Sequence, residues 1–172
     1  MELALQQEKA KQLRADIIKM LYLCQSGHPG GSLSLVEMLM AIYYNTAHVD
    51  PKNPKWEDRD RFVLSKGHTA PGLYAALAYR GFFPVEDLPT LRHIDSYLQG
   101  HPNMNTGSLG QGLSAAAGMA KGAKFLNKDV NVYCLVGDGE LAEGQIWEAT
   151  MFAAHYKLDN LCIIVDLNGL QI

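Results

Sequence analysis

Two oxygen-bearing side chains follow two apolar segments of this 172-residue chain. Asp138 lies between two glycines after the apolar run 131–136, and Asn168 follows the apolar run 161–166. A helical segment, 142–158, separates the two runs, so the pattern predicts a strand–helix–strand unit. Ligands of open α/β sheets bind at the carboxyl ends of the strands. Asp138 and Asn168 would meet at that edge, where their oxygens could hold a hard divalent cation.

The same residues have a simpler explanation. Asp-Gly and Asn-Gly pairs are ordinary turn sequences, and spacing alone does not distinguish a turn from a metal site. A third metal ligand would have to be a backbone carbonyl after Asn168, in the turn that contains Leu170. Water and substrate phosphates would complete the shell, as is usual when Mg²⁺ bridges to a diphosphate. The glycines beside Asp138 would let backbone N–H groups approach a phosphate.

Three histidines lie in loops that contain glycine or proline: His28, His68 and His101. Loops after strands carry functional residues disproportionately often. An imidazole in such a loop can move protons to and from hydroxyl groups or hydrogen-bond to a phosphate. The alternative is three solvated turn residues. A zinc site is disfavoured, because no cysteine pair and no HExxH sequence accompanies the histidines.

A glycine-rich segment, 106–112, precedes a helix of small residues. It does not follow a strand and lacks the Lys-Ser/Thr end of a P-loop, so nucleotide binding is disfavoured. The segment could present backbone groups to another ligand, or it could be a plain loop. Glu140, Glu143 and Glu148 come after the Asp138 turn, and acidic residues favour helix N-termini. Glu143 and Glu148 have apolar neighbours, and a buried carboxylate would need a partner or a proton.

Composition excludes several classes of function. Hydrophobic residues make up 48% of the chain and charged residues 19%, which indicates a globular protein. A net charge of −3 with scattered basic residues argues against nucleic-acid binding. No apolar run has the length of a membrane span, and the start does not resemble a signal peptide. The cysteines show no metal or disulfide spacing, which favours a reducing, cytoplasmic location.

Alternating helical and apolar segments predict an α/β fold with a mostly parallel sheet. We expect strands at 61–64, 131–136 and 161–166, helices at 5–25, 35–44, 72–80, 113–126 and 142–158, and a short helical connection at 84–92. Ser34 and Glu37 form the expected capping box of the second helix. Because the last strand ends shortly before Ile172, we expect the fold to be incomplete at its C-terminal end.

Five motifs together resemble the transketolase family of thiamine-diphosphate enzymes, over about residues 10–172. They are Ser26-Gly27-His28-Pro29-Gly30, Leu64-Ser65-Lys66-Gly67-His68, Gly100-His101-Pro102, Thr106-Gly107-Ser108-Leu109-Gly110-Gln111-Gly112, and Gly137-Asp138-Gly139 with Asn168. One such motif is moderately specific, whereas five in the family's order are strongly specific. The resemblance implies a three-layer thiamine-diphosphate-binding fold, with residues 1–172 as a single diphosphate-binding domain that is truncated relative to the family.

The resemblance also implies a cofactor site. Asp138, Asn168 and the Leu170 carbonyl would hold Mg²⁺, for which Ca²⁺ or Mn²⁺ could substitute. His68 and the Gly139 N–H would contact the diphosphate of the thiamine cofactor. The other residues expected to bind the cofactor are Gly107, Ser108, Leu109, Glu140, Glu143 and Asn168.

The same resemblance implies catalytic roles for His28, His68, His101 and Glu143. His28 and His101 would face the substrate hydroxyls and move protons. Glu143 and Glu148 would lie at a subunit interface and couple to the aminopyrimidine side of the site.

The implied activity is transfer of a two-carbon ketol unit from a ketose phosphate to an aldose phosphate. The family also needs a pyrimidine-binding domain, which this chain is too short to contain. We therefore expect an amino-terminal subunit that works with a separate C-terminal subunit, in a heterotetramer or around a homodimer of this chain. Two alternatives stay open: a non-catalytic truncated binding module, and a related thiamine enzyme such as 1-deoxyxylulose-5-phosphate synthase. The short loop 103–105 departs from the family's pattern.

Overall fold

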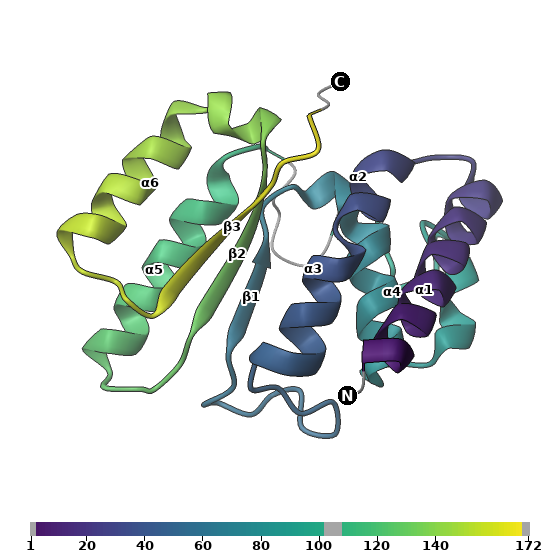
Figure 1. The fold of residues 1–172 in the computed structure, drawn as a ribbon, viewed down its shortest axis with the longest axis horizontal. Helices are drawn as coiled ribbons and strands as arrows, with labels where there is room; N and C mark the ends of the chain where they lie inside the picture. Colours follow the sequence, from purple (N-terminus) through teal and green to yellow (C-terminus); the bar gives the residue numbers. More distant parts are fainter. Residues whose placement is uncertain (1–2, 102–107, 170–172) are drawn as a thin grey trace. The chain divides into compact units, whose positions relative to one another are not determined.

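The structure is a computed structural model that describes residues 3–101 and 108–169. The chain forms two compact units (Figure 1). The first consists of Met1–Lys55 and His68–Pro102, and the second of Trp56–Gly67 and Asn103–Ile172. The first unit is helical and the second holds the sheet. The chain passes from the second unit to the first between Gly67 and His68.

The first unit is built from helices whose apolar faces pack together. Its elements are α1 (Leu3–Cys24), α2 (Pro29–Ser34), α3 (Val36–Ala41), a π-helical turn (Ile42–Thr46), α4 (Ala70–Arg80) and a 3-10 helix (Val85–Thr90). Leu13, Ile17 and Met20 recur at helical spacing on α1 and are buried. The predicted helices at 5–25 and 72–80 are confirmed, and α4 ends at Gly81, whose left-handed φ of 97° favours glycine.

The predicted capping box at Ser34 and Glu37 is wrong. Ser34 belongs to α2, where its hydroxyl donates to the Gly31 carbonyl at 3.1 Å. Glu37 instead accepts hydrogen bonds at 2.5 Å from Arg14 on α1. The chain can begin α2 at Pro29 because proline suits the first helical position. The glycines after Pro29 therefore lie in a short helix rather than in an open turn.

The second unit contains a three-stranded parallel sheet in the order β1-β2-β3. Its strands are β1 (Arg61–Leu64), β2 (Val132–Gly137) and β3 (Leu161–Asp166), which confirms the predicted α/β class with a parallel sheet. The register pairs Leu64 with Leu135 and Gly137 with Asp166. All three strands therefore end at one edge, which carries the polar segments that follow them.

Two helices, α5 (Gln111–Phe125) and α6 (Gly144–His155), cover one face of this sheet (Figure 1). The predicted helix 142–158 begins later than expected, because Gly139–Ala142 forms a 3-10 turn before it. Small side chains on α5 let its backbone pack closely on the strands. The core between helices and sheet consists of Val63, Leu113, Ala116, Ala117, Ala120, Val132, Cys134, Val136, Ile146, Ala149 and Leu158.

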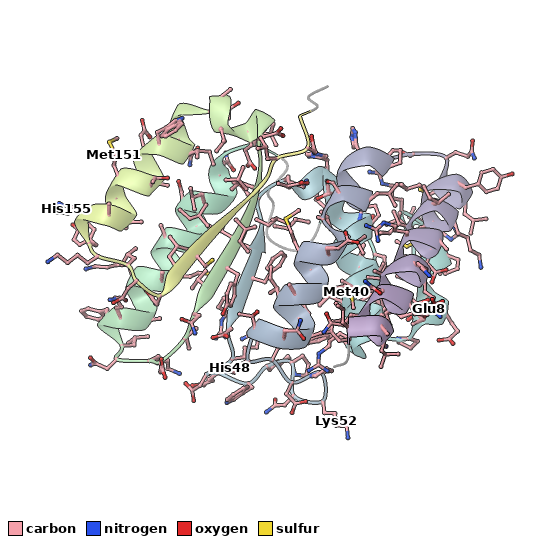
Figure 2. All side chains as sticks on the ribbon, in the orientation of Figure 1. Glu8, Met40, His48, Lys52, Met151 and His155 are labelled. Carbon is pink, nitrogen blue, oxygen red and sulfur yellow. The ribbon has the colours of Figure 1, made fainter. Side chains whose placement is uncertain are left out.

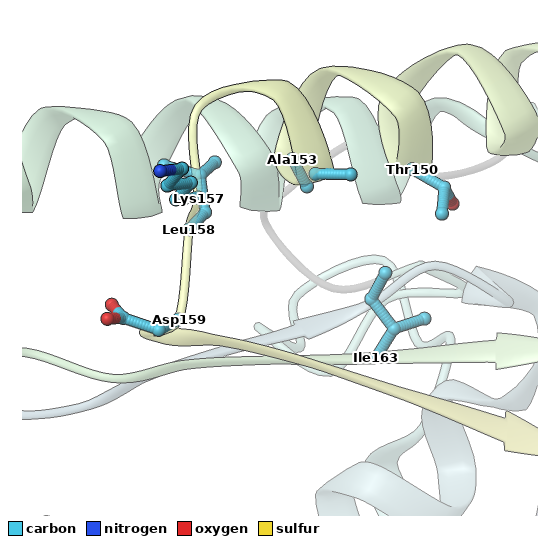
Figure 3. A pocket seen from close by; sticks show the side chains of 7 residues that line it. Thr150, Ala153, Lys157, Leu158, Asp159 and Ile163 are labelled. Atoms are coloured by element: carbon cyan, nitrogen blue, oxygen red, sulfur yellow. The ribbon is translucent and has the colours of Figure 1, made fainter.

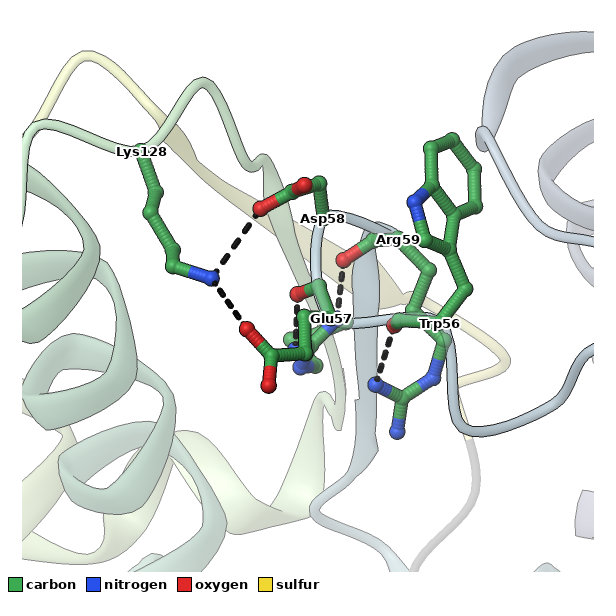
Figure 4. Close-up of polar contacts among 6 residues, drawn as sticks. Trp56, Glu57, Asp58, Arg59 and Lys128 are labelled. Carbon is green, nitrogen blue, oxygen red and sulfur yellow. Dashed lines mark hydrogen bonds and ion pairs between the residues drawn. The ribbon is translucent and has the colours of Figure 1, made fainter.

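The opposite ends of the strands and the outer face of α6 are polar or solvent-facing. Lys128 pairs with Glu57 at 3.1 Å and Asp58 at 3.0 Å, near the amino ends of β1 and β2 (Figure 4). Hydrogen bonds to these carboxylates raise the pKa of Lys128, with the largest contribution from Asp58.

Met151 and His155 on α6 point outward (Figure 2). Within the described ranges, no helix has the length and apolarity that a membrane crossing requires.

Two glycines of α5 give a matched test of this packing. A Cβ at Gly112 would lie 2.6 Å from Ser65 Cα, whereas a Cβ at Gly118 would meet nothing within 4 Å. We expect Gly112→Ala to lower the free energy of unfolding by about 1–3 kcal/mol through overpacking. Gly118→Ala should raise it by about 0.5–1 kcal/mol, because alanine favours the helix. Urea denaturation measures both changes, and equal effects at the two positions would contradict the packing described.

Thiol reactivity tests the buried face of β2. Burial, with a contribution from the Glu140 carboxylate, raises the pKa of Cys134 to about 12. Since the thiolate is the reactive form, Cys134 should resist iodoacetamide at about pH 8 while the protein is folded. Cys162 on β3 is exposed and should be alkylated under the same conditions. Peptide mass spectrometry reads both sites, and comparable alkylation rates would show that β2 is not buried as described.

Candidate cofactor site at the carboxyl edge of the sheet

Asp138 is hydrogen-bonded to the turn that follows β3. Its Oδ2 accepts the Gly169 N–H at 2.8 Å, and its Oδ1 accepts the Gly139 N–H at 3.0 Å. Gly169 has a φ of 72°, a left-handed conformation that favours glycine. The Asp138 N–H donates to the Asp166 carbonyl at 3.2 Å. The segment with Asp138 and the segment with Asn168 therefore lie together, as the sequence pattern predicts.

The donor set at this edge fits a hard cation. The Asp138 carboxylate is partly exposed and keeps lone pairs beyond the two hydrogen bonds that hold it. Among the described residues, no group of three or more His, Cys, Asp or Glu side chains is arranged to hold a metal. A cation at Asp138 would thus take its other ligands from amide, carbonyl, water or phosphate oxygens, which suits Mg²⁺. Leu170, the expected carbonyl ligand, lies outside the described residues.

A buried ion pair stands beside Asp138. Lys66 donates to Asp166, and both side chains are almost fully buried, at 2% and 5% exposed. The Lys66 stem passes Gly137, where an added Cβ would lie 3.6 Å from Lys66 Cδ. Lys66 thereby neutralises the second carboxylate of this edge. The sequence patterns assigned no role to Lys66 or Asp166. The signal that could have found them is Asp166 itself, because a charged residue at the end of an apolar strand needs a buried partner.

Glu140 points into the protein. It is 2% exposed, and its carboxylate accepts hydrogen bonds from Ser65, Gly110 and Gly137. Its expected contact with the cofactor stays a prediction, as does the expected Gly139 contact with the diphosphate. In this structure the Gly139 N–H donates a hydrogen bond to Asp138 Oδ1.

The other expected cofactor residues of this unit are on its surface. Ser108 and Leu109 are exposed and lead into Gly110, which has a left-handed φ of 88° and caps α5. Glu143 occupies the N-cap position of α6 without a side-chain capping hydrogen bond, and both Glu143 and Glu148 are exposed. Gly107 lies outside the described residues.

The first unit brings two of the three expected histidines together. The rings of His28 and His68 are 5.1 Å apart between centroids, in an edge-to-face arrangement at 79°. Gly31 makes room for Thr69 beside this pair, because a Cβ there would lie 2.7 Å from Thr69 Cγ2. His101 is exposed and follows Gly100.

Arg92 connects two of the histidine loops within the first unit, and the sequence patterns did not single it out. Its guanidinium donates to the Ser26 hydroxyl. The same group lies against Gly100, where an added Cβ would be 3.3 Å from Arg92 Nε. Arg92 also has a left-handed φ of 62°, which is uncommon for a non-glycine residue. No local signal marks such a residue, because its partners come from distant segments.

A shallow hollow in the second unit lies elsewhere. It has a volume of about 380 Å³ and is lined by Thr150, Ala153, Ala154, Lys157, Leu158, Asp159 and Ile163 (Figure 3). These residues come from the end of α6 and the beginning of β3. The hollow therefore lies away from the carboxyl edge and contains none of the expected site residues.

Comparison with known proteins identifies the family. The family model described as "Transketolase, thiamine diphosphate binding domain" matches residues 5–172, and the chain belongs to this family. The solved transketolase of Campylobacter jejuni superposes with a TM-score of 0.92 at 38% identity, over 99% of this chain and 29% of that protein. This similarity confirms the thiamine-diphosphate-binding α/β fold.

Two similar relatives are named as subunits. The 6-deoxy-6-sulfo-D-fructose transketolase subunit SqwG of Clostridium sp. (strain MSTE9) is 50% identical over 85% of this chain, which spans 56% of that protein. A protein of Phocaeicola vulgatus, named as one subunit of apulose-4-phosphate transketolase, is 45% identical over 99% of this chain, which spans 62% of that protein. The chain thus spans little more than half the length of these curated relatives.

Removing one member of the buried ion pair should destabilise the fold. Lys66→Met leaves the Asp166 carboxylate buried without its cation, and we expect the free energy of unfolding to fall by about 3–5 kcal/mol. In Lys66→Met/Asp166→Asn both charges are gone, so the double variant should lose less than the sum of the two single variants. Urea denaturation of all four proteins gives the coupling energy, which we expect to exceed about 1 kcal/mol. Strictly additive losses would contradict a direct interaction.

Proposed function

We propose that this chain is the amino-terminal, cofactor-binding subunit of a two-chain transketolase. The complex would transfer a two-carbon ketol unit from a ketose to an aldose, with thiamine diphosphate and Mg²⁺. One observation carries the proposal: the hydrogen bond between Asp138 Oδ2 and the Gly169 N–H, which joins the two halves of the cofactor motif at one sheet edge. Membership of the transketolase family and the two relatives named as transketolase subunits support it.

The proposed cofactor site assigns each residue a physical task. Asp138, Asn168 and the Leu170 carbonyl would hold Mg²⁺, with Ca²⁺ or Mn²⁺ as substitutes. The Gly139 N–H and His68 would donate to the diphosphate, because backbone N–H groups and imidazoles are both hydrogen-bond donors to anions. Residues 107–109 would line the aminopyrimidine and the thiazolium. When bound, thiamine diphosphate would supply the nucleophilic carbon that takes up the two-carbon unit.

The histidines would serve the substrate. His28 and His101 would hydrogen-bond to the hydroxyl groups of the sugar and exchange protons with them. The close pair of His28 and His68 supports a shared polar surface, because each ring can orient the other. Positioning of the sugar in this way is the contribution that a protein makes to cofactor chemistry.

The C-terminal subunit would contribute the pyrimidine-binding side of the site. Exposed apolar residues on α6 support a partner surface, since Trp147 and Met151 are 58% and 65% exposed. Glu148 lies on the same helix and Glu143 immediately precedes it, and both would belong to this interface. We propose a heterotetramer, or a homodimer of this chain that recruits the partner. A cytoplasmic location is part of the proposal and is supported by the three free cysteines.

Calorimetric titration tests the proposal. We expect thiamine diphosphate with Mg²⁺ to bind the chain together with a carboxy-terminal transketolase subunit, and Asp138→Ala to weaken binding at least about 100-fold, because the charged metal ligand is lost. Asp129→Ala, which changes an exposed aspartate of the same unit, is the matched control and should bind normally. Absence of cofactor binding with and without the partner would overturn the proposal.

Product analysis of the assembled complex separates the remaining alternatives. Transfer from xylulose phosphate to ribose phosphate is the expected result. Condensation of pyruvate with glyceraldehyde phosphate would instead indicate a synthase of the same family. Unchanged turnover after Asp138→Ala would indicate that this chain is a non-catalytic binding module.

A further inference from the structure

Glu140 is a buried carboxylate whose three hydrogen-bond donors come from three separate segments of the second unit. Its Oε1 accepts the Ser65 hydroxyl at 2.5 Å and the Gly110 N–H at 2.6 Å, and its Oε2 accepts the Gly137 N–H at 3.1 Å. Ser65 follows β1, Gly110 precedes α5 and Gly137 ends β2. One side chain therefore ties together three elements that meet at the carboxyl edge of the sheet.

These contacts require a carboxylate. All three partners donate to Glu140, and an ionised carboxylate is an acceptor at both oxygens. A glutamine of the same size would present an amide N–H₂ to at least one of the three donors. A buried donor that loses its acceptor is costly, so the isosteric amide could not reproduce the arrangement.

Glycines let the segment before α5 approach both the segment after β1 and the turn before α6. Gly112 lets the backbone of α5 approach Ser65, since a Cβ at this position would lie 2.6 Å from three Ser65 atoms. Gly110 has a left-handed φ of 88°, and a Cβ there would lie 3.1 Å from Glu143 Cβ. The Glu140 hydrogen bonds thus lie in a tightly packed region, where movement of one segment would displace the segments packed against it.

The two segments that Glu140 holds lead directly into the proposed cofactor site. Gly137 immediately precedes Asp138, the proposed metal ligand. Gly110 immediately follows Ser108 and Leu109, which are expected to line the cofactor. We propose that Glu140, in place of the cofactor contact expected from the sequence, has a positioning role: it does not touch the cofactor but fixes the Asp138 turn through Gly137 and the loop before α5 through Gly110. This inference rests on the proposed function, because it concerns the same site.

Hydrogen exchange of the cofactor-free complex with the partner subunit gives the first test. In Glu140→Gln, at least one of the Gly110 and Gly137 amides should exchange at least about tenfold faster, because the glutamine N–H₂ replaces its acceptor oxygen. Glu86→Gln changes an exposed glutamate of the first unit and should leave both rates unchanged. Unaltered exchange at Gly110 and Gly137 in Glu140→Gln would overturn the proposal.

Cofactor titration gives the second test, at a temperature where the variant is fully folded. We expect Glu140→Gln to raise the dissociation constant and the KM for thiamine diphosphate with Mg²⁺ about tenfold, while kcat at saturating cofactor stays within about twofold. Ser65→Ala removes one donor and should raise the dissociation constant about threefold. If Glu140→Gln does not fold, the dissociation constant of Ser65→Ala tests the positioning role instead.

The outcomes are distinguishable. A lower melting temperature with an unchanged dissociation constant would make Glu140 a purely structural residue and overturn the proposal. A large loss of kcat with an unchanged KM would place Glu140 in the reaction itself and also overturn it. If the unmodified complex binds no thiamine diphosphate, the proposed function fails, and the positioning role fails with it.

Discussion

Parallel strands end together, and this geometry places several polar groups at one partly buried edge. Such an edge is stable only when each buried polar group has a partner. Here Lys66 neutralises Asp166, and the Glu140 carboxylate accepts three hydrogen bonds. The remaining carboxylate of this edge, Asp138, is held by two backbone N–H groups and stays partly exposed. The edge thus separates internally paired carboxylates from one that faces outward.

Much of this arrangement can be read from local sequence patterns. The continuous apolar runs at 61–64 and 161–166 coincide with β1 and β3, and the run at 131–136 differs from β2 by one residue at each end. Short apolar runs separated by helices indicate a parallel sheet, because neighbouring parallel strands need a crossover connection that is usually a helix. The approach of Asp138 to the turn after β3 follows from that topology, since consecutive parallel strands end at the same edge.

The contacts that organise the edge could not be predicted in this way. Lys66 and Asp166 are 100 residues apart, and Ser65 and Glu140 are 75 residues apart. Local patterns carry no information about which distant donor meets which acceptor. An acidic residue such as Glu140 is common at the start of a helix, so the sequence alone does not indicate that Glu140 points inward. The same limitation explains Arg92 and the wrong capping box, because Glu37 takes a partner from another helix.

The structure also gives a physical reason for glycines within and next to the family motifs. Gly112 makes room for Ser65, Gly31 makes room for Thr69, and Gly169 supplies the left-handed turn whose N–H holds Asp138. Each of these positions joins two segments that carry a proposed functional residue. The motif sequences are therefore constrained by packing between segments as well as by contact with a ligand.

A crystal structure of the assembled complex with thiamine diphosphate and Mn²⁺ would test the central claim most directly. Anomalous scattering locates the metal without reference to any assumed ligand. We expect a metal about 2.1 Å from an Asp138 carboxylate oxygen and in contact with Asn168 and the diphosphate. Asp166 should still be paired with Lys66, and Glu140 should still accept from Gly137. A metal bound by Asp166 or Glu140, or a cofactor bound away from Asp138, would contradict the account.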